Sequence, residues 1–482
     1  MTTRAPNIVF ILTDQLRHDF LGCYGAEFLK TPTIDWLAEQ GTRYETCISP
    51  SPICVPARAM MLTGMDAHRT GVVHNLQWLR PDKHRMGVKT WPEHLSGIGY
   101  HTVAVGKMHF YPWDASEGFR ERVIAEDKRH IHIHDDYYDA LRAAGYRKLH
   151  GNEMAGYQKN KGACVSPLPD DLQIDRWVGQ QAEKAIEGHD TDTPLGLMVG
   201  FPGPHCPYDP PAEALSRIDV EALPDPVPET EESRTHRAGF IAGYKRAWAD
   251  LDYSSLTRAQ IRVIRQHYAA SVERIDADVK GIVQALKRKQ MLDNTIIIFT
   301  SDHGDFLGDF GMVGKGLFHE PSIRVPLIVT DYRARQGSVS TEMTSLVDLY
   351  PSLLAWAGAE PDPNTQGISI GEETSGRVIV GATNQGAMAR DARWKLVNYR
   401  NGAQALFDLQ ADPHEQDNLI ESEPAHVRRL MAVLTGSLVD GLTASHADLL
   451  VNEVKKPPPH PFYDRHWSRE YPSNLGDPEL GK

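Results

Sequence analysis

Cys54, in the segment "SPICVPARAMMLTG" at residues 51–64, is the side chain whose neighbours most strongly suggest chemistry. A buried cysteine usually behaves as a small hydrophobic residue. Here we expect Pro52 and Pro56 to hold the backbone around Cys54 out of a helix, while Arg58 places a permanent cation about one helical turn away. Because a nearby cation lowers the pKa of a thiol or holds an anion beside it, the segment predicts a reactive cysteine.

Polar side chains directly follow several of the apolar runs that we expect to form buried strands. In a parallel sheet covered by helices, ligands bind beyond the carboxyl ends of the strands. Carboxylate, amide and imidazole donors at such ends suit a hard divalent ion, Ca²⁺ first, with Mg²⁺ or Mn²⁺ as alternatives. One aspartate after a strand is more often a helix N-cap, but two such ends in one sheet favour a metal. The candidate ligands are Asp14 and Gln15 after residues 8–12, and Asp302 and His303 after residues 295–300.

Lysines and histidines in similar positions would hold an oxyanion beside the metal. Lys107 and His109 follow the run at 102–105, His205 lies in "GPHCPYDPP", and Lys315 lies in "MVGKGLF". Each residue alone has an ordinary alternative, as a surface lysine or a loop histidine. The competing interpretation of the cysteine is a nucleophile of the protease kind, which needs a histidine and an oxyanion hole but no metal. That interpretation leaves the carboxylates and the lysines unexplained.

The spacing of apolar residues predicts an α/β fold, a mostly parallel central sheet flanked by helices. The clearest helix covers residues 259–288, where apolar residues recur at three- and four-residue steps. Residues 216–254 are rich in Pro, Glu and Arg and lack a clear period, which predicts a long surface insertion. The expected buried strands are Ile8–Leu12, Thr102–Val105, Leu195–Val199, Thr295–Thr300 and Val325–Val329.

The pattern changes after "PDPNTQGISIG" at residues 361–371, where short alternating segments predict an antiparallel sheet. We therefore expect a catalytic α/β domain at residues 1–371, a smaller C-terminal domain at 372–450 and an extended proline-rich arm at 451–482. The arm carries Phe462, Tyr463 and Trp467, which we expect to pack on a neighbouring subunit in a homo-oligomer. An arm folded onto its own domain is the alternative.

Composition limits the class of protein. Of the 482 residues 41% are apolar and 24% are charged, which predicts a globular chain. No run approaches the roughly 20 apolar residues of a membrane helix, so we expect no membrane partner. A net charge of −13 without a basic run argues against a nucleic-acid partner. The five scattered cysteines favour neither a disulfide framework nor a structural zinc site. With no cleavage site behind a long apolar region at the N-terminus, we expect a cytoplasmic protein.

The segment "CVPARAMMLTG" resembles the signature of the type I sulfatases, Cys-x-Pro-x-Arg followed by Leu-Thr-Gly. In that family, which is part of the alkaline phosphatase superfamily, the cysteine is oxidised after translation to formylglycine by a formylglycine-generating enzyme. The blocks "NIVFILTDQ", "GKMHF", "PHCPYDPP" and "FTSDHGDFLGDFGMVGKGLFHEPSIRVPLIV" resemble family segments in family order. The resemblance implies an alkaline-phosphatase-like fold and hydrolysis of sulfate monoesters, of the aryl sulfate type.

The resemblance also implies roles for individual residues. An oxygen of modified residue 54 completes the metal site and attacks sulfur, Arg58 and Lys107 hold the modified residue, and His205 protonates the departing alcohol. His109 removes a proton so that sulfate is expelled, and Asn75 in "HNLQW" lines the same pocket or has a plain loop role. The implied metal ligands are Asp14, Gln15, Asp302, His303 and residue 54, and the implied substrate-binding residues are Lys107, His205, Lys315 and Asn75.

One departure from the family pattern keeps a second activity open. Family members usually carry two successive aspartates after the first strand, and here the second is Gln15. Some phosphonate monoester hydrolases of the same superfamily share this Asp-Gln pair, so hydrolysis of phosphonate monoesters or phosphodiesters is the alternative function. "GKMHF" resembles choline sulfatases and "HEPSIRVPL" resembles sulfatases of sugars and aryl esters, so the leaving alcohol stays open. A non-catalytic metal- or anion-binding protein is a third reading, in which the modification motif would have no purpose.

Overall fold

The computed structural model describes residues 4–81, 83–246, 250–360, 362–372 and 374–455. The strands are β1 Asn7–Asp14, β2 Thr42–Ile48, β3 His101–Gly106, β4 Glu121–Ile124, β5 Leu195–Pro204, β6 Thr295–Ser301, β7 Arg324–Val325, β8 Leu327–Asp331, β9 Ser338–Ser345, β10 Ile379–Thr383, β11 Gly386–Arg390, β12 Trp394–Tyr399 and β13 Gln404–Asp408. The α-helices are α1 Pro32–Gln40, α2 Cys54–Thr63, α3 Ala67–Thr70, α4 Trp91–Gly97, α5 Asp136–Ala143, α6 Ile174–Gly188, α7 Ala212–Leu215, α8 Glu231–Arg246, α9 Arg258–Arg288, α10 Glu320–Ile323, α11 Leu349–Ala357 and α12 Pro424–Lys455.

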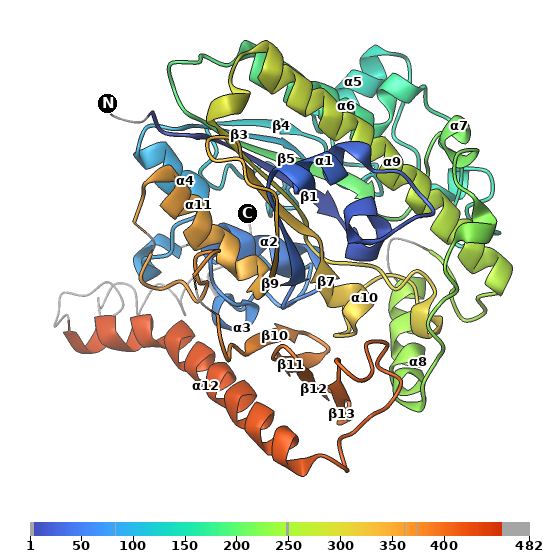
Figure 1. Ribbon diagram of the computed structural model, residues 1–482, viewed down its shortest axis with the longest axis vertical. Helices are drawn as coiled ribbons and strands as arrows, with labels where there is room; N and C mark the ends of the chain where they lie inside the picture. Colours follow the sequence, from blue (N-terminus) through green and yellow to red (C-terminus); the bar gives the residue numbers. More distant parts are fainter. Residues whose placement is uncertain (1–3, 82, 247–249, 361, 373, 456–482) are drawn as a thin grey trace, which may run out of the picture.

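A nine-stranded sheet forms the centre of the molecule, with the order β4-β3-β5-β1-β6-β8-β2-β7 and with β9 paired to β2 (Figure 1). The five strands from β4 to β6 run parallel, as predicted, whereas β8 pairs antiparallel with β6. A separate sheet of four antiparallel strands, β10-β11-β12-β13, lies in the C-terminal part. The predicted fold, a mostly parallel α/β core with a smaller antiparallel sheet, is therefore confirmed.

Strand β1 shows how the sequence builds both faces of this core. Val9 and Ile11 point into the cluster beneath α1, α6 and α9, whereas Ile8, Phe10 and Leu12 point into the cluster beneath α2, α4 and α11. Because successive side chains of a strand point to opposite faces, a continuous apolar run is what a strand buried on both sides requires.

The predicted helix at 259–288 is α9, one residue longer at its N-terminus. The Thr257 hydroxyl accepts a hydrogen bond from the backbone N–H of Gln260, and the Gln260 side chain accepts one from the N–H of Thr257. This reciprocal cap satisfies two N–H groups that a helix end leaves open, so the helix begins there.

Three expectations need correction. The expected strand at 325–329 is divided into β7 and β8, because Pro326 has no N–H with which to continue a ladder. The segment 216–254 contains α8, which the lack of apolar period did not indicate. Helix α12 continues through Lys455, past the expected start of an extended arm at 451. The rest of that arm, with Phe462, Tyr463 and Trp467, lies outside the described residues. The expected packing of these aromatic residues on a neighbouring subunit therefore stays a prediction.

The antiparallel sheet is attached to the core on one side and covered by α12 on the other (Figure 1). Leu430 and Leu434 of α12 are buried among Val380, Leu396 and Leu406 of the sheet. On the core side, the Glu320 carboxylate at the start of α10 pairs with Arg390 at 3.1 Å and with Lys395 at 3.0 Å. Within the described residues, no helix combines the length and the apolar character needed to cross a membrane.

The contact between α6 and α9 contains a carboxyl group whose protonation should affect stability. Asp278 on α9 is buried, accepts a hydrogen bond from Arg176 Nη1 at 3.0 Å through one oxygen, and its other oxygen has no hydrogen-bond partner among the described residues. Burial raises the pKa of Asp278 to about 7, although Arg176 opposes the shift.

We expect Asp278→Asn to flatten the pH dependence of stability. Between about pH 4 and pH 7 the folded protein holds a proton that the unfolded chain releases, so wild-type stability falls as the pH rises. The asparagine keeps an acceptor for Arg176 and carries no charge, so the variant should gain on the order of 2 kcal/mol relative to wild type between pH 5 and pH 8. Urea unfolding at both pH values measures this difference. Parallel profiles would mean that Asp278 stays ionised in the fold.

Candidate active site

Cys54 is the first residue of helix α2, which corrects the expectation that the prolines keep it out of a helix. Pro56 lies in the first turn, where backbone N–H groups have no partner within the helix, so its missing N–H costs nothing. The N–H of Val55 instead donates to Asn75 Oδ1 at 3.0 Å. The side chain of residue 54 therefore sits at the positive end of the helix dipole, which stabilises negative charge on it.

Gly64, the last residue of the "LTG" segment, ends helix α2, and the structure shows why a glycine is needed there. Its φ of 67° lies in the left-handed region, and its N–H donates to Met60 O at 2.8 Å. A Cβ at this position would lie 2.4 Å from Thr365 Oγ1 and 2.5 Å from Tyr350 Cδ1. Only glycine fits both the conformation and the space, so the helix that carries Cys54 ends where α11 and its following loop pack.

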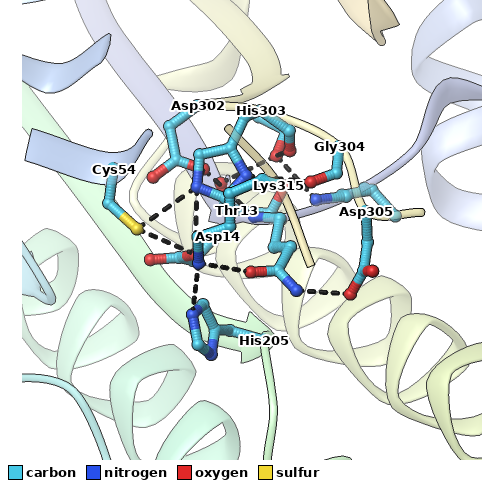
Figure 2. Close-up of polar contacts among 12 residues, drawn as sticks. Thr13, Asp14, Cys54, His205, Asp302, His303, Gly304, Asp305 and Lys315 are labelled. Atoms are coloured by element: carbon cyan, nitrogen blue, oxygen red, sulfur yellow. Dashed lines mark hydrogen bonds and ion pairs between the residues drawn. The ribbon is translucent and has the colours of Figure 1, made fainter. Parts of the chain in front are cut away.

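The parallel pairing of β1 with β6 brings the two predicted groups of ligands together. Thr13 and Ser301 are partners in register, so Asp14 and Asp302 emerge side by side at the carboxyl ends of the strands. Figure 2 shows Cys54 facing both groups, with its Sγ 3.2 Å from His303 Nε2 and 3.8 Å from Asp14 Oδ1. The ligand atoms of Asp14, Cys54, Asp302 and His303 all lie within 4.8 Å of one another.

Gln15, the fourth predicted ligand from the strands, has a strained backbone. Its φ of 74° is unusual for a residue with a side chain. Its N–H donates to Asp302 Oδ1 at 3.0 Å, and its carbonyl accepts from the Tyr268 hydroxyl of α9 at 2.6 Å. The same hydroxyl accepts from Arg17 N at 2.8 Å, so α9 holds the turn in which the strain is stored.

Arg58 lies beneath this cluster and joins its parts. Its guanidinium donates from Nε to Asp302 Oδ2 at 2.9 Å and from Nη1 to the carbonyl of Lys107 at 2.7 Å, and its Nη2 lies 3.4 Å from Asp14 Oδ2. The side chain is 1% exposed. Such a planar group with several donors can bind two carboxylates and a carbonyl at once, which an ammonium group cannot do.

Lys107 is shared between two carboxylates. Its Nζ lies 2.6 Å from Asp14 Oδ2 and 2.6 Å from Asp127 Oδ2, with all three side chains buried. Burial by itself would raise the pKa of Asp14, but Lys107, followed by His205, Lys315 and Arg58, lowers that pKa well below its usual range. Asp14 is thus ionised and able to bind a cation.

The electrostatic environment also favours the anionic form of residue 54. Burial and Asp14 raise the pKa of the Cys54 thiol, but Lys315 and His303 outweigh them, so the pKa lies below the ordinary value. Together with its position at the start of α2, this places Cys54 where negative charge is stabilised, although the main cations are Lys315 and His303 and not Arg58, which the sequence suggested.

His205 and Lys315 form a hydrogen-bonded pair beside the cluster, with His205 at the bottom of Figure 2. The two nitrogens, Lys315 Nζ and His205 Nε2, are 2.6 Å apart, and His205 Nδ1 donates to Cys206 O at 2.6 Å. Burial, Arg129 and Lys315 lower the pKa of His205 well below its usual value, so the imidazole is neutral and accepts the lysine proton.

His109 lies one residue beyond Met108 with a φ of 59°, the second strained residue at the site. Its Nδ1 is buried without a hydrogen-bond partner among the described residues. Burial first, and then Lys107, lower the pKa of its imidazole well below the usual value. A neutral histidine of this kind can accept a proton but holds one poorly.

The structure adds residues that sequence reasoning missed. Asp127 pairs with Lys107 and, through both carboxylate oxygens, with Arg129. Asp305 accepts a hydrogen bond from the Gln15 amide. Asp305 could have been found from a strand end, because it is the last residue of "SDHGD" after β6. Asp127 follows the short strand β4, which has no apolar run that would predict it.

The residues present fit a divalent metal ion. Asp14 and Asp302 supply oxygen donors in the cluster, and Gln15 Oε1, which accepts from Lys315 Nζ at 2.5 Å, is a further oxygen. His303 Nδ1 donates to Gly304 O at 2.9 Å, so Nε2 is the nitrogen turned toward the cluster. A second hydrogen bond that fixes the tautomer in this way is typical of metal-binding histidines. The mostly oxygen donor set suits Ca²⁺, Mg²⁺ or Mn²⁺.

The fold has counterparts among known proteins. The structure of a phosphonate monoester hydrolase of Agrobacterium radiobacter aligns with a TM-score of 0.76 over 90% of this chain and 95% of that one, at 23% identity. A phosphonate monoester hydrolase of Silicibacter pomeroyi aligns with a TM-score of 0.72 over 91% and 96%. At these identities the likeness concerns the fold, which is alkaline-phosphatase-like.

Sequence comparison then identifies the family. Residues 6–359 match the Sulfatase family, so this chain belongs to the sulfatases. A choline-sulfatase of Rhizobium meliloti is 31% identical over 88% of this chain and 84% of its own length. An arylsulfatase of Clostridium perfringens is 29% identical over 87% of this chain and 91% of its own length. These names support the hydrolysis of sulfate esters as the activity of this protein.

Proposed function

We propose that this protein hydrolyses sulfate monoesters of the aryl sulfate type after Cys54 has been converted to formylglycine. The observation that carries the proposal is the position of Cys54, whose Sγ lies within hydrogen-bonding reach of His303 and faces Asp14 inside the candidate metal cluster. That sulfur stands where an oxygen of the formylglycine hydrate would lie. Conversion requires a formylglycine-generating enzyme as a partner during maturation.

Formylglycine at residue 54 would supply the nucleophile, and a bound metal ion would supply part of the charge stabilisation. A bound divalent ion, Ca²⁺ first, would polarise a sulfate oxygen and favour ionisation of the attacking hydroxyl. The chain itself would help to hold that hydroxyl: Arg58 and Lys107 bind Asp302 and Asp14, the carboxylates beside residue 54, and the start of α2 favours negative charge there. Lys107 and Lys315 would balance the charge on the sulfuryl oxygens.

The His205–Lys315 pair would supply the proton that the leaving alcohol needs. As the bond between sulfur and the ester oxygen breaks, the oxygen takes the proton that lies between Lys315 Nζ and His205 Nε2, which are 2.6 Å apart. His109, neutral at ordinary pH, would accept a proton when sulfate is released from residue 54. Asn75, which caps α2 through Val55, remains a proposed lining residue of the pocket.

Conversion of Cys54 is the first test. In a preparation that hydrolyses 4-nitrophenyl sulfate, the tryptic peptide with residue 54 should show the mass of an aldehyde, with sulfur replaced by oxygen and hydrogen lost. Cys54→Ala should lower kcat by roughly 10³-fold or more, because no other side chain can replace the nucleophile. Cys23→Ala, which changes a thiol away from the cluster, serves as the control. An active sample with an unmodified thiol would refute the formylglycine mechanism.

The role of His205 predicts how rates depend on the leaving group. His205→Asn should lower kcat/KM by about 10²-fold for phenyl or alkyl sulfates, whose alcohols need a proton in the transition state. The loss should be much smaller for 4-nitrophenyl sulfate, whose leaving phenolate is stable without one. A plot of log kcat/KM against the pKa of the leaving alcohol measures this. An equal loss across the series would show that the His205–Lys315 pair does not donate the proton.

A phosphonate monoester or phosphodiester hydrolase is the second candidate. Gln15 favours it, because the family pattern usually has an aspartate there and some phosphonate monoester hydrolases share the Asp-Gln pair. The expected outcome is a higher kcat/KM for an aryl sulfate than for the matching aryl phosphonate. The reverse order would replace the proposed function, and metal-dependent anion binding without turnover of either ester would favour a non-catalytic protein.

Cytoplasmic location and a homo-oligomer built by the C-terminal arm stay predictions.

A further inference from the structure

We infer that Asp305 is a positioning residue that decides which end of the Gln15 amide faces the metal, so that Gln15 and Asp305 act as one unit. The inference rests on the proposed function in one respect, that a divalent ion binds among Asp14, Gln15, Asp302 and His303. Asp305 itself is not one of the predicted metal ligands.

Both ends of the Gln15 amide are already engaged. Lys315 Nζ donates to Gln15 Oε1 at 2.5 Å, and Gln15 Nε2 donates to Asp305 Oδ2. An ammonium group can only donate and a carboxylate can only accept, so the two neighbours require the same orientation of the amide. Gln15 and Asp305 are both buried. Because a metal binds the oxygen of an amide and not its NH₂ group, this orientation is the one that a metal ligand needs.

Asp305 cannot turn to follow a different orientation. Its Oδ1 accepts hydrogen bonds from Leu307 N at 3.0 Å and from Gly314 N at 2.7 Å, and its Oδ2 accepts one from the Tyr208 hydroxyl at 2.6 Å. Gly314 directly precedes Lys315 in the chain. The same carboxylate therefore orients the Gln15 amide and fixes the loop that presents the lysine to it.

Changing Asp305 alone should leave the orientation of the glutamine no longer fixed. In Asp305→Asn the carbonyl oxygen must stay with the two backbone N–H groups, so the new NH₂ group faces Gln15 Nε2. Two donors cannot bond each other, so the Gln15 amide either keeps Lys315 and loses its partner at position 305, or rotates half a turn and directs its NH₂ group toward the Lys315 ammonium and the metal. In the rotated form one metal ligand is lost without any change to the ligand residues, so metal binding has to select the orientation that Asp305 fixes in the wild type.

Exchanging the two groups should restore the site. In the double variant Gln15→Glu/Asp305→Asn, the amide at position 305 donates one hydrogen to the carboxylate at position 15 and the other to the Tyr208 hydroxyl, which can rotate to accept it. Lys315 keeps its acceptor. The total charge is unchanged, but the carboxylate now lies next to the metal position, where it attracts a cation more strongly.

Titration calorimetry with Ca²⁺ and with Mn²⁺ on chelator-stripped protein tests the inference without relying on catalysis. Asp305→Asn should weaken metal binding by roughly 10- to 100-fold, the usual effect of removing a group that orients a ligand. The double variant should bind at least as tightly as wild type. Tyr208→Phe, which removes a different hydrogen bond from Asp305, should stay within about threefold of wild type. Melting temperatures of the stripped proteins show whether each variant is folded.

The outcomes separate this inference from the proposed function. Wild-type affinity in folded Asp305→Asn, or a double variant as weak as the single one, would overturn the role of Asp305 and leave the proposed activity intact. Wild-type protein that binds neither metal would overturn both. Restored binding in the double variant beside weak binding in Asp305→Asn would establish the pair.

Discussion

The burial of Asp14 and Asp302 beside Arg58 is the interaction on which the rest of the site depends. Both carboxylates are 0% exposed, and a buried charge is stable only when it is paired and hydrogen-bonded. Arg58 bridges the two, and because it comes from α2, pairing the charges also fixes the helix that begins with Cys54. The position of residue 54 is thus a consequence of how the negative charges of β1 and β6 are balanced.

The balance extends outward through shared groups. Lys107 lies between Asp14 and Asp127, and Asp127 in turn binds Arg129. On the other side, Lys315 donates to Gln15 and pairs with His205. Under the proposed function Lys107 and Lys315 would also meet the sulfate group, so the same charges would serve stability without substrate and recognition with it.

The C-terminal sheet contributes support to the site although it supplies none of the predicted catalytic residues. The Ser51 hydroxyl donates to Ala382 O of β10, and a Cβ at Gly381 would lie 1.9 Å from Pro50 O. Glycine at 381 therefore lets β10 approach the segment that leads into α2. Since Ser49 Oγ donates to Asp302 O at 2.6 Å, the small sheet helps to hold the chain just before Cys54 against the residue that follows β6.

The sequence by itself determined the elements and most of the chemistry. The continuous apolar runs of β1 and β6 and the period of α9 follow from burial on two faces and on one face, and the polar residues after each strand were found by that rule. The features that the sequence could not determine are either short elements or conformations that depend on partners distant in sequence. β4 and with it Asp127, the break at Pro326, helix α8 and the strained turn at Gln15 have no local signal of their own. Orientation was decided only by tertiary structure, because the groups that set it lie in other segments of the chain than the residues that they hold: Asp305 for Gln15, Tyr268 for the turn at Gln15, and Asn75, 20 residues beyond Val55, for α2.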